Sequence, residues 1–249
     1  MEETIKEYKE KGITDADIKT LHTHSGSDVG VFRRLAQRRL FNEPFAYLFN
    51  KAKFLGNDFY VDRRVYIPNS ETEQMVEALF KEIKNGDTVV DVGCGSGAIA
   101  VSIKLRVPQV TVFGVELDPT ALEVARHNAD FFKAKVQFVE SLYVDDLGIS
   151  APEYVIADLP YGDKDHLLDT NNEQEIPHLP PVSFWHPAGS LAAYQELIAS
   201  ILKKKWKTVL FFETGKVEKE QVAKIIPPGL QWEYVQTTPN YSFTKIHFS

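Results

Sequence analysis

The feature that most constrains this chain is a short apolar strand followed at once by a glycine-rich loop and then by a helix. Residues 88–91 have the pattern of a buried strand, the loop is Asp91-Val-Gly93-Cys94-Gly95-Ser96-Gly97, and residues 98–105 have a helical pattern. Glycines at this position allow a tight turn and let a ligand approach the backbone closely. The pattern therefore predicts an α/β fold with a ligand site just beyond this strand.

The chain beyond this loop continues to alternate between strand and helix. The alternation predicts a doubly wound, mostly parallel sheet of the Rossmann-like type, with its last two strands antiparallel at one edge. With the strand at 88–91 the predicted sheet is seven-stranded, its other strands being 110–116, 136–139, 154–157, 208–212, 232–236 and 242–248. The predicted helices of this region are 98–105, 119–132, 191–203 and 217–226.

The segment before this sheet has two different patterns. Residues 1–44 are polar and weakly helical, which predicts a small helical cap. Residues 45–68 are rich in aromatic and β-branched side chains with interspersed turn residues, which predicts a β-hairpin linker. The run Ser70-Glu71-Thr72-Glu73 has the form of a capping box and predicts a helix reaching to about Asn85. We therefore expect three parts: a cap at 1–44, a linker at 45–68 and a main domain at 69–249.

Composition narrows the class of protein. The chain has 249 residues, of which 43% are hydrophobic and 25% charged, as in ordinary globular proteins. The net charge of −7 repels polyanions, so nucleic acid would need a local basic patch. Two candidate patches are the arginine group Arg33, Arg34, Arg38 and Arg39 and the lysine-rich run 203–207, and a solvated helix surface is the favoured interpretation of both.

A few residues indicate the cellular compartment and bear on membrane and metal binding. Cys94 is the single cysteine, which suits a reducing compartment. The first residues contain no apolar signal region, and no run is long enough to span a membrane. His22 and His24 form no metal-binding set with other ligands. These observations predict a cytoplasmic protein without membrane or metal partners.

The acids that flank the glycine loop indicate which ligand it binds. Gly93, Gly95 and Ala98 also satisfy a relaxed dinucleotide fingerprint, so a nicotinamide enzyme is a competing interpretation. However, the carboxylate of Asp91 suits the cationic amine of an amino acid rather than a phosphate. Glu116 ends the next strand, where an acid binds ribose hydroxyls. Together these residues favour S-adenosylmethionine, which carries a ribose and an amino-acid end but no phosphate.

A second motif, Asp158-Leu159-Pro160-Tyr161, follows the strand at 154–157 and thus lies at the same edge of the predicted sheet. Methyl transfer to a planar amide or exocyclic amine requires a site that orients the NH2 group and accepts its hydrogens. The Asp158 side chain and the Leu159 carbonyl can accept these hydrogens, Tyr161 can stack on the flat group, and Pro160 stiffens the turn. The motif therefore predicts a catalytic site for nitrogen methylation.

In this order the motifs resemble the HemK/PrmC family, class I methyltransferases that modify the side-chain nitrogen of glutamine in peptide-chain release factors. The resemblance covers about residues 43–215. It rests on Glu43-Pro-Phe-Ala-Tyr47, Phe54-Leu-Gly56, Phe59-Tyr-Val-Asp62, Pro68-Asn-Ser-Glu71-Thr-Glu73, Asp91 to Ala100 and Ala157 to Tyr161.

The resemblance implies the cofactor S-adenosylmethionine and a role for each matched residue. It implies that Asp91 and the loop residues Gly93, Cys94, Gly95, Ser96 and Gly97 hold the methionine part. It also implies that Glu116 binds the ribose, with Leu117 as a further cofactor-binding residue. Leu142 and Tyr143 would lie beside the adenine, and Asp158 would serve both cofactor and acceptor.

The sequence also departs from the family pattern. Leu142 stands where the family has an acid, and Asp158-Leu159 stands where it has Asn-Pro. The N-terminal helical segment is shorter than the family's. Three hypotheses therefore stay open: a protein glutamine methyltransferase with a release factor as its partner, an adenine N6 methyltransferase on RNA or DNA, and a non-catalytic cofactor-binding paralogue. The net charge favours the protein acceptor over RNA.

The long polar stretch 162–189 is a candidate lid or binding loop. Its side chains Phe184, Trp185 and His186 either line the substrate pocket or form a small core beneath the loop.

Overall fold

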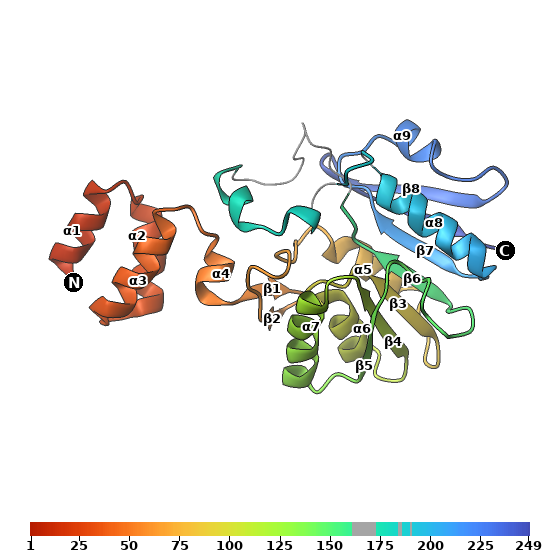
Figure 1. The fold of residues 1–249 in the computed structure, drawn as a ribbon, viewed down its shortest axis with the longest axis horizontal. Helices are drawn as coiled ribbons and strands as arrows, with labels where there is room; N and C mark the ends of the chain where they lie inside the picture. Colours follow the sequence, from red (N-terminus) through yellow and green to blue (C-terminus); the bar gives the residue numbers. More distant parts are fainter. Residues whose placement is uncertain (161–172, 184–185, 190) are drawn as a thin grey trace. The chain divides into compact units, whose positions relative to one another are not determined.

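The computed structural model describes residues 1–160, 173–183, 186–189 and 191–249 (Figure 1). The chain divides into two compact units, each considered by itself below. The helical unit consists of residues 1–51 together with 170–178, and the sheet unit consists of residues 52–169 together with 179–249.

The helical unit is a small bundle around its own apolar core. Its helices are α1 (Glu2–Glu10), α2 (Asp15–Ser25), α3 (Val29–Arg39) and α4 (Phe45–Phe49). The side chains of Thr14 and Asp28 cap the starts of α2 and α3 by accepting the N–H groups of Asp17 and Val31. The helices bury a shared core, and the helical character predicted for the first 40 residues is therefore present. The core includes Tyr8, Ile18, Leu21, Phe32, Leu35 and Leu48.

Three of the four arginines of the arginine group form ion pairs inside this unit, the weakest being that of Arg33 with Glu7 at 3.8 Å. The Arg38 guanidinium donates to both carboxylate oxygens of the buried Glu43 at 2.7 Å. Arg39 donates to Asp17 at 2.9 Å and to Glu175 at 2.8 Å. These pairs fasten the 3-10 turn Glu173–His178 to α3, and they leave only part of the predicted basic patch available to an anionic partner.

The hairpin predicted over residues 45–68 is shorter than expected. Residues 45–49 form α4, because Tyr47 and Leu48 donate their N–H groups to the carbonyl of Pro44 at 3.0 Å. The hairpin consists of β1 (Ala52–Phe54) paired antiparallel with β2 (Asn57–Phe59). Beyond it the Asp62 carboxylate accepts the Arg64 N–H at 3.0 Å, which closes a turn where the pattern predicted strand.

The sheet of the sheet unit has seven strands in the order β5-β4-β3-β6-β7-β9-β8. The pairs from β5 to β7 are parallel, and β9 pairs antiparallel with both β7 and β8. The predicted fold class, a doubly wound and mostly parallel seven-stranded sheet, is confirmed. The strands are β3 (Thr88–Val92), β4 (Thr111–Glu116), β5 (Val136–Glu140), β6 (Tyr154–Ala157), β7 (Val209–Glu213), β8 (Gln231–Thr238) and β9 (Tyr241–His247).

Both faces of this sheet are buried, because alternate residues of each strand point to opposite sides. Val89 joins the core cluster that contains side chains of α5 and α6, whereas Val90 joins the cluster that contains side chains of α8. The helices of this unit are α5 (Glu73–Phe80), α6 (Ala98–Arg106), α7 (Pro119–Phe132), α8 (Ala192–Lys204) and α9 (Lys219–Ala223), with a 3-10 turn at Pro181–Ser183.

Of the two helix starts predicted from capping patterns, that of α7 is confirmed and that of α5 is wrong. Asp118 caps α7 as expected, since its carboxylate accepts the N–H of Thr120 at 2.8 Å and Pro119 occupies the first turn. The capping box at 70–73 is wrong: α5 begins at Glu73, no side chain caps it, and Glu73 instead accepts the N–H of Leu55 at 2.9 Å. The helix also ends at Phe80, earlier than predicted.

Within the described ranges, none of the helices combines the length and apolar character required to cross a lipid bilayer.

Candidate functional site

The glycine loop and the Asp158 motif meet where the order of the parallel strands reverses. From β3 the chain proceeds outward through β4 and β5, and then returns to β6 on the other side of β3. Since β3 and β6 are parallel neighbours, the loops that follow Val92 and Ala157 leave the same edge side by side. Open α/β sheets bind ligands at such a switch point.

The glycine loop is held by backbone hydrogen bonds that need its glycines. The N–H groups of Gly93 and Cys94 donate to the carbonyl of Val115 at 2.8 and 2.9 Å. Gly93 has a φ of 73°, and a Cβ there would lie 2.5 Å from Cδ2 of Leu159. Gly97 has a φ of 76° and would meet Ala125 at 3.1 Å. At Gly93 the loop thus packs directly against the second motif and at Gly97 against α7, with no room for a larger residue at either position.

Asn128 of α7 ties the loop to the segment after the hairpin. Its amide group donates to the carbonyl oxygens of Ser96 and Tyr60 at 2.9 Å, and its Oδ1 accepts the Tyr60 N–H at 2.8 Å. The side chain is buried and fully engaged. The sequence analysis missed this residue, because an asparagine inside an amphipathic helix has no pattern that distinguishes it from a surface residue.

Asp91 lies completely buried at the base of the loop. Its Oδ2 accepts the N–H of Ala100 at 3.0 Å, whereas its Oδ1 has no hydrogen-bond partner among the described residues. Burial is the main cause that raises the pKa of Asp91 to about 8; the Ala100 N–H lowers this pKa, and the nearby Asp158 and Glu116 carboxylates contribute smaller increases to it. A buried carboxyl oxygen with an unused acceptor position suits a cationic or hydrogen-donating ligand group.

Glu116 ends β4 as predicted, and its carboxylate organises the backbone around it. Oε2 accepts the N–H of Gly95 at 3.0 Å, and Oε1 accepts those of Leu117 and Asp118 at 2.8 and 3.1 Å. A carboxylate has about four acceptor positions, so these bonds leave about one free. Binding both hydroxyls of a ribose therefore requires Glu116 to release a backbone donor such as Gly95.

The described part of the second motif is fixed by a tyrosine of α8. The Tyr194 hydroxyl accepts the N–H of Leu159 at 2.9 Å and donates to the Leu159 carbonyl at 3.1 Å. The first of these bonds needs an N–H group, which proline lacks, so it is available because residue 159 is leucine. The Leu159 carbonyl keeps a second lone pair for another donor. Pro160 follows directly, and Tyr161 lies outside the described residues.

Asp158 belongs to a polar cluster built from the segment before α5 and from β7 and β9. Thr72 Oγ1 lies 3.1 Å from Asp158 Oδ2 and 2.7 Å from Glu213 Oε2. The Tyr241 hydroxyl donates to the same Glu213 oxygen at 3.0 Å. Burial, followed by the negative charges of Glu213 and Asp158, raises the pKa of Tyr241. Thr72, an inner residue of the predicted capping box, therefore lies in the candidate site.

The sequence analysis did not single out Glu213, Tyr194 or Tyr241. Glu213 does carry a usable signal, since it is a charged residue at the carboxyl end of the apolar strand β7, the edge where ligands bind. Tyr194 and Tyr241 lie within apolar patterns and look like ordinary core residues.

The remaining predicted cofactor residues differ in exposure. Cys94 and Ser96 are buried in the loop, and burial raises the pKa of the Cys94 thiol. Leu117 and Leu142 are exposed side chains after β4 and β5. Tyr143 is partly buried with a φ of 52°, and its hydroxyl donates to Glu196 of α8 at 2.9 Å. The structure brings the loop, Glu116 and Asp158 together, and the contacts of the other residues with a ligand stay predictions.

Two further predictions concern segments that the structure describes only in part. The candidate lid 162–189 is described at 173–183 and 186–189, and Phe184 and Trp185 lie outside the described residues. In the lysine-rich run, Lys203 pairs with Asp145 at 3.5 Å and Lys204 donates to the Leu147 carbonyl at 2.9 Å. These contacts agree with the interpretation of this run as a partly solvated helix end.

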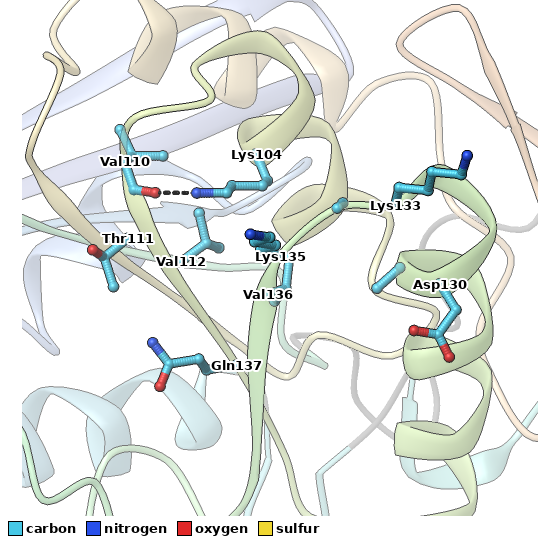
Figure 2. A pocket seen from close by; sticks show the side chains of 11 residues that line it. Lys104, Val110, Thr111, Val112, Asp130, Lys133, Lys135, Val136 and Gln137 are labelled. Carbon is cyan, nitrogen blue, oxygen red and sulfur yellow. Dashed lines mark hydrogen bonds between the residues drawn. The ribbon is translucent and has the colours of Figure 1, made fainter.

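A pocket of about 720 Å³ lies between α6, β4, α7 and β5, away from the polar cluster around Asp158 (Figure 2). It is lined by Thr111 and Val136, the first residues of β4 and β5, so it lies at the opposite edge of the sheet from the glycine loop. One of its lysines, Lys104, donates to the carbonyl oxygens of Val110 and Pro108 at 2.6 and 2.9 Å. It contains none of the predicted site residues.

Comparison with known proteins finds one matching family model and several curated relatives. Residues 69–171 match the family model described as the methyltransferase small domain. The chain is 39% identical over 131 residues to the release factor glutamine methyltransferase of Neisseria gonorrhoeae. The matched region covers 49% of this chain and 48% of that protein. It is 34% identical over 180 residues to the release factor glutamine methyltransferase of Enterococcus faecalis, covering 69% of this chain and 62% of that protein.

The chain thus spans between about half and just under two thirds of the length of these two curated relatives. Over the matched residues they confirm the resemblance predicted from the motifs. Among solved structures, the ribosomal protein L11 methylase of Lactobacillus delbrueckii is similar in fold, with a TM-score of 0.54 and 13% identity over 74% of this chain and 82% of that chain.

Proposed function

We propose that this protein is an enzyme that transfers a methyl group from S-adenosylmethionine to the side-chain amide nitrogen of a glutamine, with a peptide-chain release factor as the acceptor protein. The observation that carries the proposal is the direct packing of Leu159 on Gly93, which brings a cofactor-type loop and an amide-binding motif together at the switch point. The names of the curated relatives support the same reaction.

The residues present fit this cofactor. Asp91 Oδ1, which has no hydrogen-bond partner in the described part of the chain, is suited to the cationic amine of the methionine part. A Cβ built on Gly95 would meet only one atom within 4.0 Å, so the backbone of the loop can be approached closely there. The Glu116 carboxylate suits the ribose hydroxyls. When bound, the sulfonium of the cofactor supplies an electrophilic methyl group.

The chain's own residues orient the acceptor nitrogen. An amide nitrogen is a poor nucleophile because its lone pair is delocalised, so rate depends on holding the NH2 group in line and excluding water. The Asp158 carboxyl and the Leu159 carbonyl accept its two hydrogens, and the Tyr194 hydroxyl fixes the Leu159 carbonyl in position. A general base is unnecessary, because the positively charged product loses its proton readily after transfer.

Neither alternative is favoured by a specific observation. The adenine methyltransferase and the non-catalytic paralogue both predict the same sheet and loop, but the two curated relatives are named for glutamine methylation. A cytoplasmic location stays a prediction from the sequence.

The test is incubation of the full chain with isotope-labelled S-adenosylmethionine and either a release factor or total RNA, followed by mass spectrometry. The expected result is one methyl group on a glutamine of the release factor, lost with Asp158→Ala. Label in RNA alone would replace the proposed acceptor with a nucleic acid. Cofactor binding without label in either acceptor would contradict the proposed reaction.

A further inference from the structure

The pocket between α6, β4, α7 and β5 lies where two helices end and two neighbouring strands begin. α6 ends at Arg106 and α7 at Phe132, whereas β4 begins at Thr111 and β5 at Val136. Valine, alanine and threonine side chains make up more than half of its lining, and such small residues fill the space incompletely. The volume of about 720 Å³ is in the range of pockets that bind small organic molecules.

The floor of this pocket is apolar. Val110 and Val112 are each 1% exposed and Ala129 is 5% exposed, and all three belong to the core cluster that contains side chains of α5 and α6. Ala134 and Val136 are half-buried and pack against the same cluster. An apolar ligand surface placed here would leave water and contact side chains that the core already holds in position.

One cation in the wall of the pocket is held in place by the backbone. The half-buried Lys104 of α6 donates to the carbonyl oxygens of Val110 at 2.6 Å and of Pro108 at 2.9 Å, and Figure 2 shows the first of these bonds. An ammonium group has three N–H donors, so one is left for a ligand. Because its position is already fixed, Lys104 loses little conformational freedom when it binds an anion.

The charge around the pocket is positive, whereas the whole chain has a net charge of −7. Lys133 and Lys135 are exposed and add two cations, and Asp130 is the one acid among the described residues that line the pocket. Lysines near helix C-termini commonly complement the helix dipole, which contributes about −0.5 charge at each of the two helix ends. Three ammonium groups exceed Asp130 and both helix ends together, which leaves a net charge of about +1.

We propose that this pocket binds a small organic anion, that is, a molecule with an apolar body and one anionic group such as a carboxylate or sulfonate. The valines and alanines of the floor contact the apolar body. The third N–H of Lys104 donates to the anionic group, and Lys135 adds attraction at the rim. A net charge of about +1 suits a single anionic group and not a polyanion such as nucleic acid.

This site is separate from the proposed transfer site. It lies at the first residues of β4 and β5, whereas Glu116 and the glycine loop lie at the last residues of β4 and β3. The five steps from Thr111 to Glu116 span roughly 17 Å at about 3.3 Å per residue. Binding in the pocket therefore neither requires methyl transfer nor depends on it.

The experiment is titration of the isotope-labelled full chain with naphthalene-1-sulfonate, followed through its backbone amide NMR signals. The uncharged naphthalene-1-sulfonamide has nearly the same shape and tests the role of charge. We expect shifts of the Thr111, Val136 and Gln137 amides, with the sulfonate bound at least about fivefold tighter than the sulfonamide. Saturating S-adenosylmethionine should leave these shifts in place, because the glycine loop lies at the opposite edge of the sheet.

Lysine-to-methionine variants remove one charge and keep the length of the side chain. Lys104→Met should weaken sulfonate binding about tenfold and Lys135→Met about threefold, because a half-buried, hydrogen-bonded charge interacts more strongly than an exposed one. Lys104→Arg keeps the charge and should retain most of the binding. Lys207→Met is the matched control, because Lys207 is exposed in the same unit and does not line the pocket.

The proposal fails if no amide of the pocket shifts at up to about 10 mM sulfonate, or if the shifts lie at the glycine loop instead. Equal affinity for the sulfonate and the sulfonamide would also overturn it, since the pocket would then select apolar shape and not charge. So would equal sulfonate affinity in Lys135→Met and Lys207→Met, two exposed substitutions whose folding the same spectra report. A protein that binds the sulfonate as expected but transfers no methyl group would contradict the proposed function alone.

Discussion

The glycine loop and the Asp158 cluster lie at the same edge of one sheet, yet they are built in different ways. The loop occupies one short stretch of sequence, and its shape comes from backbone hydrogen bonds and from glycines with positive φ. The cluster takes Thr72, Asp158, Glu213 and Tyr241 from four separate segments. Its properties depend on side-chain contacts over as many as 141 residues of sequence separation.

This difference separates two kinds of function. A loop binds its ligand through backbone groups, so this binding depends on the shape of the loop. It therefore tolerates changes of side chains elsewhere in the fold. A cluster of side chains sets charge, proton position and orientation, and it fails when any member is lost. We therefore expect substitutions in the loop to affect cofactor affinity, and substitutions in the cluster to affect transfer with cofactor affinity largely kept.

The largest expected effect is on transfer in Asp158→Ala. Loss of the carboxyl group removes one acceptor for the amide hydrogens, so methyl transfer should fall below detection. Cofactor affinity should change by less than about tenfold, or ~1.4 kcal/mol, as measured by calorimetry. Unchanged turnover would remove Asp158 from the catalytic site, and a complete loss of cofactor binding would erase the distinction between loop and cluster.

The next largest effect is expected for Gly93→Ala, which tests the contact between the glycine loop and Leu159 of the second motif. The added Cβ would lie 2.5 Å from Leu159 Cδ2, and the backbone φ of 73° is unfavourable for alanine. We expect a loss of ~1–3 kcal/mol in the free energy of unfolding and more than tenfold weaker cofactor binding. Gly86→Ala is the matched control, because Gly86 has a φ of 94° but open space around it. Equal effects of the two variants would mean that backbone strain, and not contact with Leu159, is the cause.

The pH dependence of stability tests the buried carboxyl group at the base of the loop. The pKa of Asp91 is raised to about 8 in the folded protein, so the folded state binds its proton more tightly than the unfolded state does. The free energy of unfolding should therefore fall by up to ~1.4 kcal/mol per pH unit from about pH 4 to pH 8. Asp91→Asn should flatten this decline in denaturation curves recorded at several pH values. If the free energy of unfolding declines equally with pH in the wild type and in Asp91→Asn, a group other than Asp91 is responsible for the decline.

The smallest expected effect on methyl transfer is that of Tyr194→Phe. This change leaves the buried N–H of Leu159 without its acceptor, which costs ~1–3 kcal/mol of stability, and it frees the carbonyl that orients the amide. Transfer should slow about tenfold while cofactor affinity stays within about twofold. Tyr154→Phe, which removes a hydroxyl bonded to the Glu82 carbonyl, is the control for loss of a tyrosine oxygen. Equal transfer in the two variants would show that Tyr194 is structural only.

Local patterns predicted the parts of the fold that depend on neighbouring residues. The strand predicted at 154–157 has the observed bounds, and the cap at Asp118 is as expected, because burial period and side-chain capping are properties of short segments. Residues 45–49 have the composition of a strand but form α4, since the carbonyl of Pro44 starts a helical turn there. Composition alone does not contain that hydrogen bond.

The sheet, the glycine loop, the acid at Glu116 and the position of Asp158 after a strand all follow from patterns in the sequence. Periodicity and glycine placement are enough for these, because each depends on the backbone of one segment. The surroundings of Asp158 arise only on folding. In the sequence Thr72 is an inner residue of an apparent capping box, yet folding brings its Oγ1 within 2.7 Å of Glu213 Oε2, a contact over 141 residues that no local pattern contains.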